Sequence, residues 1–298
     1  ATAASPSFVM ASSGIEATVN GQTFSETLAN TKAVVDAIGD INFVNGTTGA
    51  ATQTLAPTSD GGVAQSLWNG GTVDQLTQKN FFGADGTLAG TIGFHYDNSS
   101  SATPLSGTIT NAAGTALGSY TVNSDGSITY VNTDPSTGHV LLTTTVDVNG
   151  HIINQTPGAT ADTTNNPAFV QAFADTLATQ LISEVLIKNN LPASLAATAF
   201  ADAVVKSAIP TAGQNLTFSQ DLAQSTLDVA GGFAGSEIGG QIASALGLPS
   251  QVGSLAGGVT GNLLAQALFK DVAANVGIPV DSQAVLTPAN FATGISGA

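Results

Sequence analysis

The side chains that could carry chemistry are three histidines, the carboxylates and the side-chain amides. The chain contains no cysteine. The histidines are His95, His139 and His151, and none is spaced as in the His-x-x-x-His or Glu-x-x-His motifs of metal sites. We therefore expect surface or cross-strand histidines. A catalytic site assembled from distant histidine and aspartate residues stays open as an alternative.

Two short loops rich in oxygen ligands make calcium the best candidate ion. One loop contains Asn123 and Asp125, the other contains Asp147 and Asn149, and each is followed directly by a glycine. Both resemble half of a calcium-binding loop, although the later glutamate that completes an EF-hand loop is missing. Asx-Gly pairs are also ordinary hairpin turns, and we favour that interpretation over a metal site.

Motifs for nucleophilic catalysis and phosphate binding are missing from the sequence. Ser254 has Val252 where the first glycine of a Gly-x-Ser-x-Gly elbow should stand. No Gly-Lys-Ser/Thr sequence follows a glycine-rich loop. Trp68, the only tryptophan, could stack on a sugar ring, although a small core anchor is the commoner role. We predict no catalytic residues and no cofactor other than a candidate calcium ion.

The composition is poor in charge and strongly acidic. Charged residues make up 8% of the 298 residues, against an average of about 25%. Five lysines and no arginine leave a net charge of −15, which excludes the basic patches that nucleic-acid binding requires. A polar, uncharged surface without cysteine suits an exported bacterial protein that contacts glycans, cations or other copies of itself. Because Ala1 is not a methionine, we expect a processed product or a fragment.

The first half of the chain is predicted to be β-rich with one early helix. Phe24, Leu28, Thr31, Val35 and Ile38 follow helical spacing and predict a helix over 22–38. The Thr/Gly/Ala-rich stretch 45–62 is typical of a loop. Short runs of β-forming residues separated by Gly, Asn and Asp then predict about six strands between 76 and 155. Hairpins are expected around residues 124–126 and 147–150, with further turns at 85–86 and 111–114.

The second half is predicted to be helical. Phe169, Phe173, Leu177 and Leu181 form an i, i+4 row, and a shorter helix is expected over 193–208. The fold class is therefore α+β, an antiparallel meander or sandwich-like region followed by helices. The expected division is a β-rich region 1–156, a linker 157–166 and an α-helical region 167–298.

A ladder of small residues dominates the end of the helical region. Two helices are expected, about 219–246 and 250–276, with Pro249 between them. Each glycine within a helix lowers the stability of that helix by about 1 kcal/mol relative to alanine. Close contact between glycine faces would offset that cost. We predict an antiparallel glycine-zipper hairpin over 219–276, with association between molecules and membrane insertion as alternatives. The packing residues are Gly231, Gly235, Gly239, Gly247, Gly253, Gly257 and Gly261.

One short stretch resembles the VCBS and bacterial cadherin-like repeats of large secreted adhesins, whose strand pair reads Gly-x-Tyr/Leu-x-Val-x-x-Asp-Gly-x-x-Thr-Tyr. The matching residues are Gly118, Tyr120, Val122, Asp125, Gly126, Thr129 and Tyr130. The zipper region 229–269 is also similar to segments of giant RTX-type secreted proteins and polymorphic toxins. No Gly-Gly-x-Gly-x-Asp repeat is present, so the calcium array of RTX proteins does not carry over.

These features predict a non-enzymatic structural or adhesive segment of an exported bacterial surface protein, extracellular or on the cell surface. Expected partners are further copies of the chain, other surface proteins or glycans, with no nucleic acid and with membrane contact less favoured. The alternative function is a toxin-delivery or pore-forming segment that inserts the glycine-rich hairpin.

Overall fold

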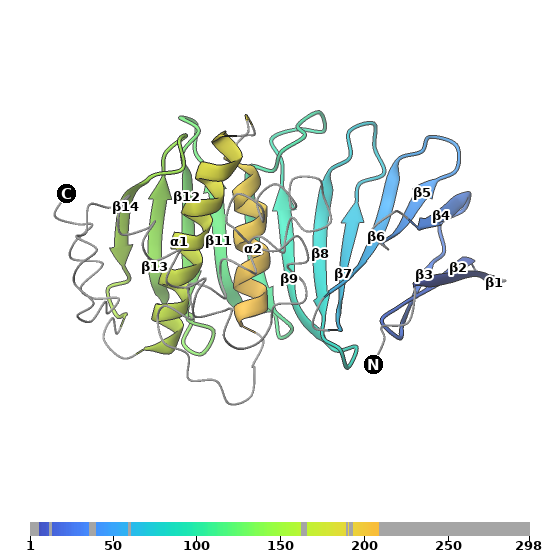
Figure 1. Cartoon of the computed structure of the whole chain (residues 1–298), viewed down its shortest axis with the longest axis horizontal. Helices are drawn as coiled ribbons and strands as arrows, with labels where there is room; N and C mark the ends of the chain where they lie inside the picture. The colour runs from blue at the N-terminus through green and yellow to red at the C-terminus, as the bar shows by residue number, and fades with distance from the viewer. Residues whose placement is uncertain are drawn as a thin grey trace. The chain divides into compact units, whose positions relative to one another are not determined.

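The computed structural model describes residues 6–11, 14–35, 40–58, 61–161, 166–188, 190 and 193–208. Within this part of the chain, fourteen β-strands precede two α-helices (Figure 1). The chain divides into two compact units, residues 1–114 and 115–298. The predicted order, a β-rich region followed by helices, is therefore confirmed for the described residues.

The first unit contains ten of these strands. Strands β1 to β3 form one antiparallel sheet, and β4 to β10 pair with each other in sequence order, each antiparallel to the next. Their bounds are β1 Ser7–Ala11, β2 Gly14–Val19, β3 Gln22–Glu26, β4 Thr31–Val35, β5 Ile41–Asn45, β6 Ala51–Pro57, β7 Val63–Trp68, β8 Leu76–Phe82, β9 Leu88–His95 and β10 Ser106–Asn111.

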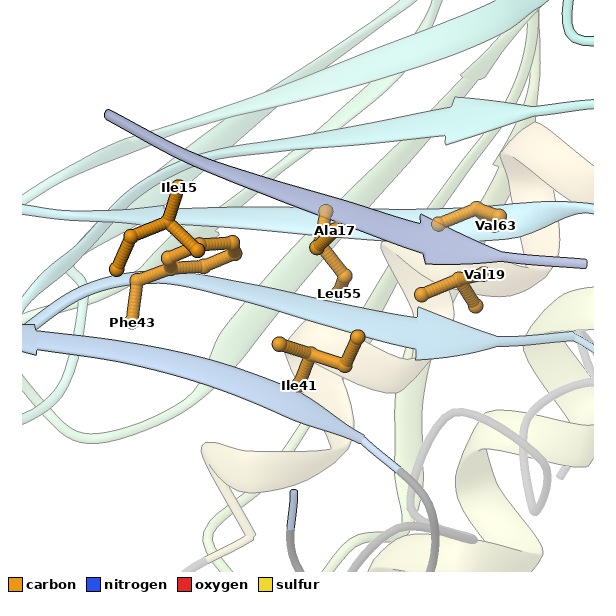
Figure 2. Packing of buried hydrophobic residues seen from close by; sticks show 7 residues of the cluster. All are labelled: Ile15, Ala17, Val19, Ile41, Phe43, Leu55 and Val63. Atoms are coloured by element: carbon orange, nitrogen blue, oxygen red, sulfur yellow. The ribbon is translucent and has the colours of Figure 1, made fainter. Parts of the chain in front are cut away.

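The core of the first unit lies between β2 and the strands β5 to β7. Alternate residues of each strand point to the same face, and on β2 these are Ile15, Ala17 and Val19, at most 3% exposed. Figure 2 shows them packed against the buried side chains of the facing strands. Burying a side chain of this size stabilises the fold by about 1.5–3 kcal/mol. The facing residues are Ile41, Phe43, Leu55 and Val63.

The described part of the second unit contains a four-stranded meander and two helices that pack on it. Helix α1 contacts β13, and α2 contacts β11 and β12 (Figure 1). The aromatic ring of Tyr130 lies 4.5 Å from that of Phe200, and both side chains are fully buried. The bounds are β11 Ala116–Val122, β12 Ile128–Thr133, β13 Val140–Val146, β14 Ile152–Pro157, α1 Pro167–Lys188 and α2 Leu195–Ser207.

Several local predictions are confirmed. Tyr120 lies opposite Tyr130 in the β11–β12 hairpin, and Thr145 lies opposite Asn154 in the β13–β14 hairpin. The range predicted to be β contains β8 to β14, one strand more than expected. The predicted row on α1 is buried throughout, with Phe169, Phe173, Leu177 and Leu181 between 0% and 6% exposed.

The predicted helix over 22–38 is wrong. Residues 22–26 form β3 and residues 31–35 form β4, with a turn between them. Asn30 takes a left-handed φ of 63°, and its carbonyl oxygen accepts a hydrogen bond from the N–H of Gly46. Phe24 pairs with Ala17 of β2. The helical spacing is therefore outweighed by cross-strand pairing across the Asn20-Gly21 turn, whose two residues both have positive φ angles, 48° and 79°. This local hairpin signal was available in the sequence, and the helix prediction did not weigh it.

The predicted loop over 45–62 is also wrong, because residues 51–57 form β6 between β5 and β7. In β6, the buried Gln53 and Leu55 alternate with more exposed residues. Because the strand is rich in threonine and alanine, this alternation of buried and exposed positions is not evident from residue hydrophobicity. The predicted glycine-zipper hairpin, with all seven glycines named for it, lies outside the described residues. No helix in the described part of the chain is long and apolar enough to cross a membrane.

Candidate functional site

The loop that contains Asn123 and Asp125 is a tight hairpin turn closed by its own side chains. The Asp125 carboxylate accepts hydrogen bonds from the backbone N–H of Ser127 at 2.9 Å and from the Ser127 hydroxyl at 2.6 Å. The side-chain N–H of Asn123 donates to Ser127 and Thr129 hydroxyl oxygens. Gly126 supplies the left-handed φ of 84° that the turn requires. The Ser127 hydroxyl is the main cause that lowers the pKa of Asp125.

The loop that contains Asp147 and Asn149 is closed in a related way. The Asp147 carboxylate accepts hydrogen bonds from the backbone N–H groups of Asn149 at 2.8 Å and His151 at 2.9 Å. Partial burial acts to raise the pKa of Asp147, but these N–H donors outweigh it and the pKa lies below the ordinary value. The His151 ring nitrogen Nδ1 lies 3.6 Å from the same carboxylate.

The structure brings the two predicted calcium loops together. A Cβ atom added to Gly126 would lie 2.9 Å from the Val148 side chain, so the two turns are neighbours. The described residues nevertheless contain no group of three or more His, Cys, Asp or Glu side chains placed to hold a metal ion. The geometry assigns a clear role to Asp125 and Asp147, which is to close their own turns. Calcium binding stays a prediction.

The same closure recurs at two further turns, which the sequence reasoning did not single out as a set. Asp85 accepts from the backbone N–H and the hydroxyl of Thr87, at 3.0 and 2.6 Å. Asp134 accepts from the corresponding groups of Ser136, at 2.8 and 2.6 Å. Hydroxyl donation from Thr87 and Ser136 is the main cause that lowers the pKa of each aspartate. The Asp-x-Ser/Thr spacing, shared with Asp125, was the available sequence signal.

Trp68 belongs to a chain of side-chain hydrogen bonds that crosses three strands. Its indole N–H donates to the Thr54 hydroxyl at 3.1 Å, and that hydroxyl donates to the Asn42 side-chain oxygen at 2.9 Å. All three residues are partly exposed. The tryptophan is thus neither a fully buried anchor nor a free ring, because its orientation is fixed and part of its surface meets solvent.

A second polar network spans β7 to β9. The side-chain N–H of Asn80 donates to Gln65 at 2.9 Å, while its side-chain oxygen accepts from Gln78 at 2.8 Å and from the Thr91 hydroxyl at 3.1 Å. These four side chains are partly exposed and none is charged. Such a surface offers amides and hydroxyls, the groups that hydrogen-bond neutral polar partners.

The three histidines are divided between the two units. His95 ends β9 in the first unit, whereas His139 and His151 belong to the second unit. His139 lies in the β12–β13 turn and His151 follows the β13–β14 turn, which places them at opposite ends of their strands. All three side chains are exposed. The alternative of a histidine–aspartate catalytic centre therefore gains no support from their placement.

Comparisons with known proteins identify no family for this chain. No family model matches the sequence, and no curated protein matches it. Two solved structures show a partial likeness: TarM, with 14% identity, and a mutant of S. aureus TarM in complex with Fondaparinux, alpha-GlcNAc-glycerol and UDP, with 12% identity. Each likeness covers 50% of this chain and 24% of the other, with a TM-score of 0.23. A score this low carries no argument about fold or function.

Proposed function

We propose that this chain is a non-enzymatic structural or adhesive segment of an exported bacterial surface protein. Its partners are then further copies of the chain, other surface proteins or glycans. Uncharged hydrogen-bonding groups make these contacts, because a net charge of −15 disfavours nucleic acid and other polyanions.

The observation that carries the proposal is the repeated closure of hairpin turns by side chains of the turns themselves. Asp85, Asp125 and Asp134 each accept two hydrogen bonds from a Ser or Thr two residues further on. In a chain without cysteine, such turns hold strand register without a disulfide. A meander fixed in this way is a suitable scaffold for an extracellular layer.

The adhesive half of the proposal rests on the two polar networks. Trp68 is partly exposed and lies beside the hydroxyl and amide groups of Thr54 and Asn42. Stacking of an aromatic face together with amide and hydroxyl hydrogen bonds is a common way to hold a neutral sugar. The pore-forming alternative depends on residues 219–276, and nothing in the described residues favours it.

Surface accessibility tests the proposal. Intact cells that make the protein would be treated with a protease that does not enter cells, with a cytoplasmic protein as control. Cleavage of the chain on intact cells is expected, and cleavage only after lysis would overturn the proposal. Trp68 fluorescence of the purified chain, titrated with neutral polysaccharides, tests the adhesive half. A saturable change that is lost in Thr54→Val supports glycan contact, and an unchanged spectrum restricts the proposal to a structural role.

A further inference from the structure

Strand β1, Ser7–Ala11, is an edge strand. It pairs with β2 on one side, and on the other side no described strand lies beside it. Its side chains are also uncovered, since Phe8 is 38% exposed, Val9 60% and Met10 75%. A strand edge with free N–H and C=O groups is a template for pairing with another strand.

The other strands that end a sheet order each carry a feature that discourages pairing. Strand β3 has the inward-pointing, buried carboxylate of Glu26, which accepts from the Leu28 N–H at 2.9 Å. Strand β4 carries the exposed Lys32 next to its first residue, and β14 ends at Pro157 and pairs with β13 through a register shift. Inward charges, edge lysines, prolines and bulges are the known protective devices. Strand β1 has no charged residue, no proline and no glycine.

The side chains of β1 are arranged symmetrically about Val9. Small residues, Ser7 and Ala11, stand at the ends, and large apolar residues, Phe8 and Met10, stand on either side of the centre. Phe8 and Met10 face the same way as the buried Ala17 and Ile15 of β2. They therefore extend the apolar core face beyond the area that β4 to β7 cover.

We propose that β1 pairs antiparallel with β1 of a second copy of this chain, about a two-fold axis at Val9. Val9 then lies opposite Val9 of the other copy, and Phe8 lies opposite Met10, where the thioether can contact the aromatic ring. A two-fold contact needs only one self-complementary surface on the chain.

The symmetric order of side chains on β1 favours a second copy as the partner, and the lack of charge on the strand makes that contact tolerable. Two chains of net charge −15 repel one another, and β1 lets them meet along a segment without any carboxylate. A basic peptide would find no acidic partner on this strand. Because a pairing of five residues on each side falls well below the roughly 800 Å² per partner of a standard interface, the contact is weak and operates at high local density.

The proposed surface role would bring many copies of the chain close together. The strand pairing rests on the proposed function only because it needs this high local density. Surface accessibility and strand pairing are separate measurements. Pairing without surface exposure would leave this inference standing and overturn the proposed function, and surface exposure without pairing would do the reverse.

Disulfide trapping in the full chain tests the pairing, because the natural sequence has no cysteine. Opposed residues of antiparallel strands have Cα atoms about 4.5–5.5 Å apart, within the range of about 4.4–6.8 Å that a disulfide spans. Val9→Cys should therefore form covalent dimers under mild oxidation several times faster than Val34→Cys on β4, where Val34 is 52% exposed. Equal rates would show random collision and overturn the proposal.

The register is tested with two further variants, one carrying Phe8→Cys and the other Met10→Cys, distinguished by a mass tag. A mixture should form the mixed disulfide faster than either variant dimerises alone, because residue 8 lies opposite residue 10. Homodimers forming as fast as the mixed dimer would contradict the two-fold axis at Val9. A Val9→Cys variant that stays monomeric and resists a thiol reagent would show that another segment of the same chain covers β1, which also overturns the proposal.

Discussion

The two units cover their strands with different material. In the first unit, β2 packs on β5 to β7 through aliphatic side chains and Phe43. In the second, α1 and α2 pack on β11 to β13, with Tyr130 against Phe200 at the contact. A helix forms its backbone hydrogen bonds within itself, whereas a covering sheet has edge strands with unpaired backbone N–H and C=O groups. The first unit therefore gains its core from a small sheet whose end strand, β1, has no described strand on its other side.

The largest expected effect is in the second unit. Phe200→Ala removes a fully buried ring, and truncations of this kind cost about 3–5 kcal/mol. Denaturant unfolding followed by far-ultraviolet circular dichroism reports the helices, while the fluorescence of Trp68 reports the first unit. The helix signal should move to lower denaturant and the fluorescence signal should move less. Equal shifts of both signals would show that the two units unfold as one.

The corresponding change in the first unit is Leu55→Ala. Leu55 is fully buried against β2, so its truncation should cost about 2–5 kcal/mol. The same two signals are measured, and the fluorescence transition should now move further than the helix transition. A larger shift in the helix signal would contradict the assignment of this core to the first unit.

Within the second unit, a comparison of alanine substitutions at two glycines distinguishes the cost of backbone strain from the cost of a steric clash. Gly138 and Gly150 both have left-handed φ angles, 72° and 83°, so alanine should cost about 1–2 kcal/mol at either site. A Cβ atom at Gly150 would also lie 2.7 Å from the Ser183 Cβ atom, whereas nothing lies within 4 Å of one at Gly138. Gly150→Ala should therefore lower the free energy of unfolding by a further 1–3 kcal/mol or so. Equal losses in thermal unfolding would show that α1 does not pack on this turn.

The smallest effect concerns the turn carboxylates and depends on pH. The pKa of Asp125 is lowered from 3.8 in the folded chain by the Ser127 hydroxyl, so ionisation of Asp125 stabilises the fold above that value. This contribution is lost as the pH falls below 3.8 through the folded pKa. Asp125→Asn should thus melt earlier than the natural chain near neutral pH, and the gap should narrow in acid. A gap that does not change with pH would rule out a role for the charge.

Local signals in the sequence predicted the main elements in the described part of the second unit. Alternation at Tyr120 and Ile128 with a glycine turn between them predicts β11 and β12, and the i, i+4 row that begins at Phe169 predicts α1. Each signal comes from residues that are close in the chain, so periodicity alone can report it.

The first unit depends on contacts between distant residues. Phe24 and Leu28 fit a helical face, yet the Phe24 ring lies 5.3 Å from that of Phe82, which is far away in the sequence. The pairing of Phe24 with Ala17 is local, since the Asn20-Gly21 turn joins their strands. The turn at Asn30 contains no glycine or proline, so the residues that most strongly predict a turn are missing there. The position of β1 at the end of its sheet, as far as the described strands show it, could not be predicted from its own residues, because it depends on which other strands pair with it. The Asp-x-Ser/Thr turns were visible in principle, since their spacing is local.

Sedimentation velocity over a range of concentrations tests most directly the claim that this scaffold associates through β1. The natural chain should sediment faster as its concentration rises. Val9→Lys should remove that dependence, while Val34→Lys, at a similarly exposed edge position on β4, should retain it. A natural chain that sediments as a monomer throughout, or one whose association survives Val9→Lys, would contradict the account.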